Sequence, residues 1–198
     1  IVLTGAALLS GSKNAALPEK DIGGTIFLVN RQHVISEQYV PEPLRKTQVH
    51  GMSQSMREDA AAALEELFQA AQADGIKLSS VSGYRSYSKQ SLLYDRKTKR
   101  TGSETEADKM VARPGASEHQ LGLAMDLATR NSSTLSEKFG STPEGQWVYA
   151  NCQRFGFIVR YLKGYEDVTG YSFEPWHIRY VGPEHAEAIA ASGLPFET

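Results

Sequence analysis

Residues 117–126 read SEHQLGLAMD and contain the pattern on which the fold prediction depends. The alternation of apolar side chains with small or polar ones predicts a strand over residues 121–128 that has one apolar face. Asp126 belongs to the opposite face, where its neighbours Ala124 and Gly122 are small. A carboxylate in such a position has the free space that a ligand site needs.

His119 could share a site with Asp126 only if the chain bends between them. In a fully extended chain, a separation of seven residues would span up to about 24 Å. Gly122 is the expected place for the bend, because glycine adopts backbone conformations that other residues avoid. The alternative interpretation is that Asp126 caps the end of the strand and that His119 is an ordinary loop residue.

A second segment rich in functional side chains, residues 173–180, reads FEPWHIRY. Glu174 and His177 are three residues apart and would lie on opposite faces of a regular strand. Pro175 interrupts that regularity, so a kink can turn both side chains toward one point. The alternative interpretation is a capped turn beside an interfacial tryptophan.

Together the two segments supply two imidazoles and two carboxylates. His119, Asp126 and His177 have the composition of the three protein ligands in a catalytic zinc site, which keeps an open position for water. Glu174 is then the candidate base that takes a proton from that water. The expected cofactor is one Zn²⁺ ion.

A positively charged group that could stabilise an oxyanion is found in residues 82–90, which read SGYRSYSKQ. Arg85 occupies a predicted strand-to-helix turn, and Gln90 follows one turn into the helix. The alternative interpretation is a surface turn in which Tyr84 and Tyr87 merely pack.

Other nucleophilic schemes fit the sequence less well. Ser117, His119 and Asp126 include the residue types of a serine triad, but they lie within ten residues and lack a G-x-S-x-G elbow. Cys152 is the only cysteine, which excludes an intramolecular disulfide and a cysteine-based metal site, and its helical setting predicts a core residue. The histidines interpreted as surface or structural residues are His33, His50 and His185.

The remaining patterns predict helices and strands in no regular alternation, which favours an α+β domain with a mainly antiparallel sheet. Helices are predicted over residues 55–73, 88–100, 143–155 and 183–192. Strands are predicted over residues 25–29, 76–82, 121–128, 157–161 and 178–181. Ser55 and Glu58 form a capping-box pattern for the first helix, and Thr142 is placed to cap the third.

The composition indicates one globular domain without a basic face. The chain has 198 residues, 40% of them hydrophobic, and a formal net charge of -2, so nucleic acid is not an expected partner. Residues 1–24 are expected to form an N-terminal arm and residues 25–198 the domain. The apolar residues 1–9 are fewer than the roughly 20 that a membrane span needs. They are interpreted as an edge strand or arm, and the alternative is a remnant beside a lost anchor.

Three motifs, in the order SGYRS at residues 82–86, SEHQLGLAMD at residues 117–126 and EPWH at residues 174–177, resemble a known family. This family is the VanY and LdcB type of zinc D-alanine carboxypeptidase, and the likeness extends over about residues 26–182. It implies a small antiparallel sheet flanked by helices, a fold shared with the VanX dipeptidases and the Hedgehog signalling domain. No family-specific pattern is recognised before Gly24 or in residues 135–145.

The resemblance also implies a role for each site residue. The implied zinc ligands are His119, Asp126 and His177. The implied catalytic groups are Glu174 as the base and Arg85, which polarises the scissile carbonyl and stabilises its oxyanion. The implied substrate contacts are Ser117 and Gln90, with Tyr84 and Trp176 shaping the pocket.

The implied reaction is hydrolysis of the terminal D-alanine bond in peptidoglycan stem peptides, with D,D-cleavage of pentapeptides preferred and L,D-cleavage of tetrapeptides as the alternative. An endopeptidase and a non-catalytic, zinc-stabilised binding module are the other interpretations. The presence of Glu174 and Arg85 argues against the binding module, because a structural zinc site closes with a fourth protein ligand. The expected protein is a monomer of the bacterial cell envelope, outside the cytoplasm, that meets a membrane only through an anchor outside this chain.

Overall fold

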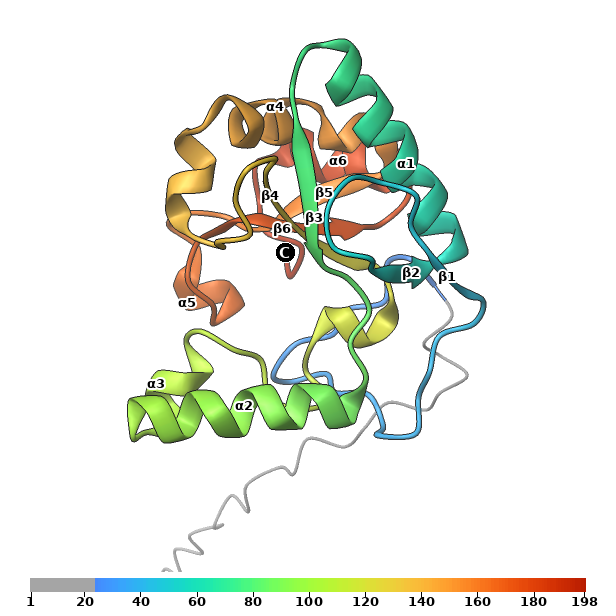
Figure 1. The fold of residues 1–198 in the computed structure, drawn as a ribbon. Helices are drawn as coiled ribbons and strands as arrows, with labels where there is room; N and C mark the ends of the chain where they lie inside the picture. The colour runs from blue at the N-terminus through green and yellow to red at the C-terminus, as the bar shows by residue number, and fades with distance from the viewer. Residues whose placement is uncertain (1–23) are drawn as a thin grey trace, which may run out of the picture.

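The centre of the molecule is a four-stranded antiparallel sheet with the strand order β3-β4-β6-β5 (Figure 1). The computed structural model describes residues 24–198, so the predicted arm lies outside the described residues except for Gly24. The strands are β3 (Leu78–Ser82), β4 (Ala124–Thr129), β6 (Glu174–Tyr180) and β5 (Phe157–Tyr161). In the register of the inner pair, β4 and β6, Asp126 lies directly opposite His177.

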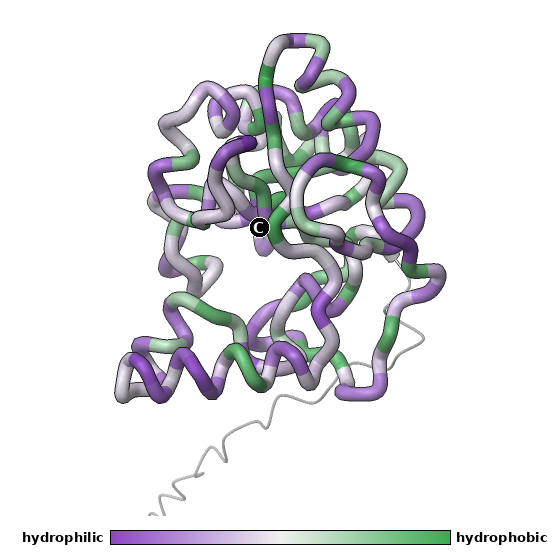
Figure 2. Tube along the Cα trace, in the orientation of Figure 1, coloured by the Kyte–Doolittle hydropathy of each residue, from purple (hydrophilic) through white to green (hydrophobic). Residues whose placement is uncertain are grey.

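Helices that pack on the sheet and on each other bury the main core. These elements are α1 (Glu58–Ala73), α4 (Pro143–Asn151) and the 3-10 turn η4 (Cys152–Phe155). The helix α6 (Pro183–Ser192) packs on η4 and β5 and buries Ala186 in a second, smaller cluster with Ile158 and Val181. The core cluster joins the apolar face of β4 to side chains of α1 and the neighbouring strands. Fully buried members include Leu64, Leu67, Met125, Leu127, Phe157 and Ile178. Figure 2 shows the corresponding concentration of apolar residues where the strands and α1 meet.

One pair of helices lies apart from this core, whereas several of the smaller elements contribute side chains to it. α2 (Tyr87–Thr101) runs along one side of the molecule and packs on α3 (Glu104–Asp108) (Figure 1). The smaller elements are β1 (Leu44–Lys46), β2 (Ser55–Arg57), η2 (Glu118–Leu121), η3 (Glu137–Ser141) and α5 (Glu166–Thr169). No helix within residues 24–198 is both long and apolar enough to cross a membrane.

The predicted α+β class with a mainly antiparallel sheet is confirmed, and several element boundaries agree closely. β5 and α6 have the predicted bounds, and α2 extends the predicted helix by one residue at each end. Thr142 caps α4 as predicted, because its side chain accepts a hydrogen bond from the backbone of Gly145. The helix predicted over residues 143–155 continues beyond Asn151 only as the 3-10 turn η4.

The start of the first helix was predicted wrongly. Residues 55–57 form β2, which pairs with β1, and the helix begins at Glu58. The predicted capping box does not form, because Ser55 takes part in this pairing and its carbonyl accepts a hydrogen bond from the backbone of Tyr84. Long-range strand pairing therefore replaces the local cap.

The strand predicted over residues 25–29 is also absent. The segment is irregular, and its carbonyl groups bond to a side chain instead of a neighbouring strand. Arg179 Nη2 donates hydrogen bonds to the carbonyl oxygens of Thr25 and Phe27 at 2.8 Å each. A buried cation thus satisfies the polar backbone groups that strand pairing would otherwise satisfy.

Candidate active site

The bend predicted between His119 and Asp126 occurs at Gly122. Residues 118–121 form η2, which ends at Gly122 with φ 69°, a left-handed conformation that favours glycine. A Cβ atom at this position would lie 3.1 Å from the backbone nitrogen of Arg57 and from Pro41 Cγ. The bend turns the chain sharply enough for His119 Nε2 to lie 3.3 Å from Asp126 Oδ2.

The orientation of the His119 ring is fixed by a backbone carbonyl. Nδ1 lies 2.8 Å from the carbonyl oxygen of Gly83, which can only accept, so Nδ1 carries the proton and donates it. Nε2 is left facing Asp126 as an unprotonated donor atom for a metal. Burial, with a contribution from nearby Arg85, lowers the pKa of His119, which favours this neutral form.

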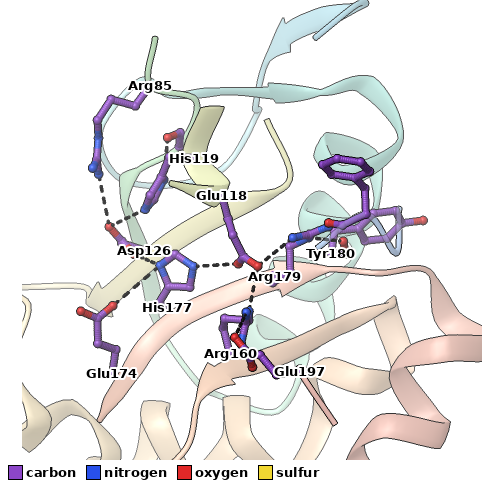
Figure 3. Close-up of polar contacts among 12 residues, drawn as sticks. Arg85, Glu118, His119, Asp126, Arg160, Glu174, His177, Arg179, Tyr180 and Glu197 are labelled. Carbon is purple, nitrogen blue, oxygen red and sulfur yellow. Dashed lines mark hydrogen bonds and ion pairs between the residues drawn. The ribbon is translucent and has the colours of Figure 1, made fainter. Parts of the chain in front are cut away.

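His177 approaches Asp126 from the neighbouring strand. Because the two residues are directly opposite each other in the β4–β6 pair, His177 Nδ1 lies 2.9 Å from Asp126 Oδ1 (Figure 3). The His119 and His177 rings meet edge to face with their centroids 5.0 Å apart. Burial would raise the pKa of Asp126, but the two imidazoles hold it well below its usual value.

This trio has the composition and spacing of a metal site. One donor atom each from His119, Asp126 and His177 lies within 4.8 Å of the others, and all three residues are buried. No other group of three or more such side chains within residues 24–198 is placed to hold a metal ion. Two imidazoles and one carboxylate, with a hydrogen-bond acceptor facing the outer nitrogen of each ring, fit zinc with an open coordination position.

An irregularity in β6 brings Glu174 to the same place. Between the paired positions Val159–Ile178 and Tyr161–Glu174, β6 advances by four residues while β5 advances by two. Glu174 Oε2 consequently lies 3.9 Å from His177 Nδ1, on the side of the trio away from His119 (Figure 3). Burial raises the pKa of Glu174 to about 7, which suits a group that exchanges protons near neutral pH.

Arg85 faces the site from the turn between β3 and α2. Its Nη2 lies 4.0 Å from Asp126 Oδ2 and donates to Ser82 Oγ at 2.9 Å. Its Nη1 donates to Gln90 Oε1 at 2.7 Å, and the Gln90 amide nitrogen donates to the carbonyl of Ala112 at 2.6 Å. One end of the Gln90 amide therefore holds Arg85 and the other is anchored to the backbone, while the substrate contact that the sequence implied for Gln90 stays a prediction.

A cleft of about 710 Å³ connects these groups to solvent. The sequence-predicted residues that line it are Arg85, Gln90, Ser117, His119, Asp126, Glu174, Trp176 and His177. Tyr84 does not line the cleft. The remaining lining comes from α2, from residues 110–112, 135–137 and 171–173, and from Glu118 and Tyr161.

Glu118 has a place in the site that the sequence did not reveal. Its side chain is fully buried, and Oε1 accepts hydrogen bonds from Arg160 Nε at 2.7 Å and from Arg179 Nη1 at 2.8 Å. Its other oxygen lies 3.5 Å from His177 Nε2. Burial would raise the pKa of Glu118, but the two guanidinium groups hold it well below its usual value. Arg160 also bonds Glu197, near the end of the chain, at 2.6 and 2.8 Å (Figure 3).

The residues set aside in the sequence lie away from these groups. Cys152 is buried in the core as predicted, and burial raises the pKa of its thiol to about 12, so it is a poor nucleophile. His33 Nδ1 lies 3.1 Å from the side chain of Asn30. Neither His33, His50 nor His185 lines the cleft.

Comparison with known proteins shows the family to which the chain belongs. The family model described as VanY, D-alanyl-D-alanine carboxypeptidase, matches residues 53–183. The chain belongs to the VanY family. Among curated VanY-type relatives, a putative carboxypeptidase of Bacillus subtilis, YodJ, is 44% identical over 179 residues, which cover 87% of this chain. The match spans only 65% of that relative's length.

Two solved structures share the VanY-type fold with this chain. The LdcB LD-carboxypeptidase, described for its recognition of peptidoglycan, has a TM-score of 0.81 and 44% identity, covering 86% of this chain and 82% of its own. A mutant of the vancomycin-resistance D,D-pentapeptidase VanY in complex with Zn(II) has a TM-score of 0.75 and 38% identity, covering 87% of this chain and 97% of its own.

Proposed function

We propose that this chain is a zinc carboxypeptidase that removes the terminal D-alanine from peptidoglycan stem peptides. The observation that carries the proposal is the buried trio of His119, Asp126 and His177 beside Glu174, at the base of an open cleft. Membership of the VanY family, the Zn(II) complex of its structural neighbour and the peptidoglycan specificity of LdcB support it. Hydrolysis by a metal-activated water is the chemistry that this set of groups can perform.

His119, Asp126 and His177 would hold the metal, with the first ring binding through Nε2 and the second through Nδ1. A zinc ion bound there supplies a Lewis acid that polarises a carbonyl and lowers the pKa of water to about 7. Each ring is oriented through the nitrogen that points away from the metal position. Nδ1 of His119 donates to the Gly83 carbonyl, and Nε2 of His177 faces Glu118.

Glu174 is proposed as the general base. Its carboxylate lies 3.9 Å from His177 on the cleft side but does not belong to the group of donor atoms that gather in the trio. With a pKa of about 7 before any metal binds, it can accept a proton from attacking water and return it to the leaving amine. Binding of a cation nearby would favour the ionised form that a base requires.

Arg85 is proposed to stabilise the oxyanion that forms on the scissile carbonyl. Its guanidinium is oriented by Ser82 and Gln90, so little rearrangement is needed as negative charge develops. Ser117, buried at the base of the cleft, and Trp176 on its wall are proposed substrate contacts.

The bond that is cut is proposed to be the D,D bond of pentapeptide stems, the reaction after which the matching family is named. The likeness to the LdcB LD-carboxypeptidase, with its TM-score of 0.81, supports the L,D bond of tetrapeptides as the second candidate. The ligands and catalytic groups of one chain complete the proposed site, so the proposed monomer needs no second subunit for the reaction. A peptidoglycan substrate supports a location in the cell envelope, outside the cytoplasm.

Purified pentapeptide and tetrapeptide muropeptides test the proposal directly. Incubation with the zinc-loaded protein should release D-alanine from at least one of them, detected by mass spectrometry. Chelation should abolish release, and added zinc should restore it. An intact pair of muropeptides, or full activity after stringent chelation, would contradict the proposed function.

A further inference from the structure

The wall of the cleft formed by α2 carries a cluster of positive charge. Arg96, Lys97 and Arg100 all line the same cleft as Glu174 and the metal-site trio. Positions 96 and 100, like 97 and 100, are neighbours on one face of a helix, so the three cations form a single surface. We call this surface of Arg96, Lys97 and Arg100 the cationic wall.

The charges of the cationic wall are not neutralised by the protein as described. Within residues 24–198, none of the three side chains forms an ion pair, and the Lys97 ammonium has only Met110 Sδ as a contact, at 3.8 Å. Arg113, on the loop below α2, contrasts with them because it is paired with both Glu104 and Asp108. Three adjacent cations without counterions repel each other, and a bound anion would relieve that repulsion.

The cationic wall and the catalytic centre line the same cleft, and Lys97 and Glu174 influence each other's charge. Burial lowers the pKa of Lys97, Arg100 lowers it further, and Glu174 acts in the opposite direction. The charge is local, because the whole chain has a formal net charge of -2. A general basic character of the protein therefore does not explain it.

The chemistry of the substrate suggests an anion for this surface. Under the proposed function, the terminal D-alanine lies at the trio and Glu174, and the rest of the stem continues along the cleft. Stem peptides carry carboxyl groups upstream of the cut. One is the α-carboxyl group of the residue that is linked to the next through its side chain. Another is the second carboxyl group that some diamino acids carry. In some stems these groups are free, and in others they are amidated.

We propose that Arg96, Lys97 and Arg100 form a subsite for free carboxylates of the stem peptide upstream of the scissile bond. The inference rests on the proposed function and adds a substrate preference to it. Stems with free carboxylates are bound and cleaved in preference to the same stems with amidated carboxyl groups. Since such contacts are the same before and during reaction, they act mainly on KM rather than kcat.

The test compares one stem peptide in free and amidated forms. The readout is the ratio of kcat/KM for the free form to that for the amidated form. For the native protein we expect a ratio of about ten, because each of a few partly exposed charge pairs contributes a small favourable free energy. This ratio should fall as ionic strength rises, because salt screens the pairs. The double variant Arg96→Gln/Arg100→Gln should bring the ratio close to one.

A matched control removes the same amount of charge from the same helix. Lys89 and Lys99 are exposed on α2 but do not line the cleft, so Lys89→Gln/Lys99→Gln should keep the native ratio. A native ratio near one, or a ratio that survives loss of Arg96 and Arg100, overturns the subsite. If no stem releases D-alanine, the proposed function fails. Calorimetric binding of the two uncleaved stems then decides the subsite separately, because equal affinities would refute it.

Discussion

Glu118 Oε2 lies 3.5 Å from His177 Nε2, at the opposite edge of the imidazole from the nitrogen that contacts Asp126. Because an ionised carboxylate can only accept, both ring nitrogens of His177 carry a proton in the metal-free protein. A metal would displace the Nδ1 proton, and Nε2 would keep its proton toward Glu118. Arg160 and Arg179 hold Glu118 in its ionised form. A network of buried charges thus determines which nitrogen of a proposed ligand faces the metal.

Replacing Glu118 should therefore weaken metal binding. Glu118→Gln keeps the shape of the side chain but removes the charge that orients His177, and loss of such a partner typically lowers metal affinity about 10- to 100-fold. Competition with a chromophoric chelator measures this affinity. The variant should also lower Tm, because two buried guanidinium groups lose part of their compensation.

Glu197→Gln separates the two effects. Glu197 bonds the same Arg160 at 2.6 and 2.8 Å but has no described contact with His177. It should lower Tm while leaving metal affinity close to that of the native protein. Equal losses of metal affinity in the two variants would mean that Glu118 acts only through general stability.

Glu174→Gln should separate catalysis from metal binding. An amide cannot accept the proton, so kcat should fall by about 10²- to 10⁴-fold. The metal content should remain at one ion per chain, because the donor atoms of the trio do not include Glu174. His177→Ala is the comparison, since it should lose both metal and activity. If Glu174→Gln retains native activity, Glu174 is not the base.

The sequence predicted the trio and Glu174 because short motifs concentrate metal-binding residue types and because Gly122 and Pro175 mark breaks in regular structure. It could not predict the Glu118 network, whose arginines lie 42 and 61 residues further along the chain. The available signal was an arginine between apolar or aromatic neighbours in each of two predicted strands, residues 157–161 and 178–181. The same buried Arg179 explains why the strand predicted at residues 25–29 is absent, since it bonds that backbone instead.

Metal binding by the metal-free protein should depend on pH. Burial alone would lower the pKa of His177, but hydrogen bonds with Asp126 and Glu118 raise it to about 9. Below pH 9 a metal must displace the Nδ1 proton, so affinity should rise up to about tenfold per pH unit toward pH 9 and then level off. The pKa of His119 is lowered, so above neutral pH this residue should release no proton.

Calorimetry at pH 7.5 in buffers with different ionisation enthalpies measures the protons released. About one proton per metal ion is expected from the protein. His50→Gln, which changes a histidine that does not line the cleft, should release the same number. Binding heats that do not depend on the buffer would contradict a protonated His177.

Arg85 and Gln90 should act as a single unit. Arg85→Ala removes the proposed oxyanion donor and should lower kcat by about 10²- to 10³-fold. Gln90→Ala removes the acceptor that holds Arg85 Nη1 at 2.7 Å, so kcat should fall by a smaller factor. Because Gln90 acts only through Arg85, adding Gln90→Ala to Arg85→Ala should cause little further loss of kcat.

Gln146→Ala, at an exposed position on α4, serves as the control and should not change kcat. Independent, additive losses in the double variant would instead indicate that Gln90 contacts the substrate directly, as the sequence predicted.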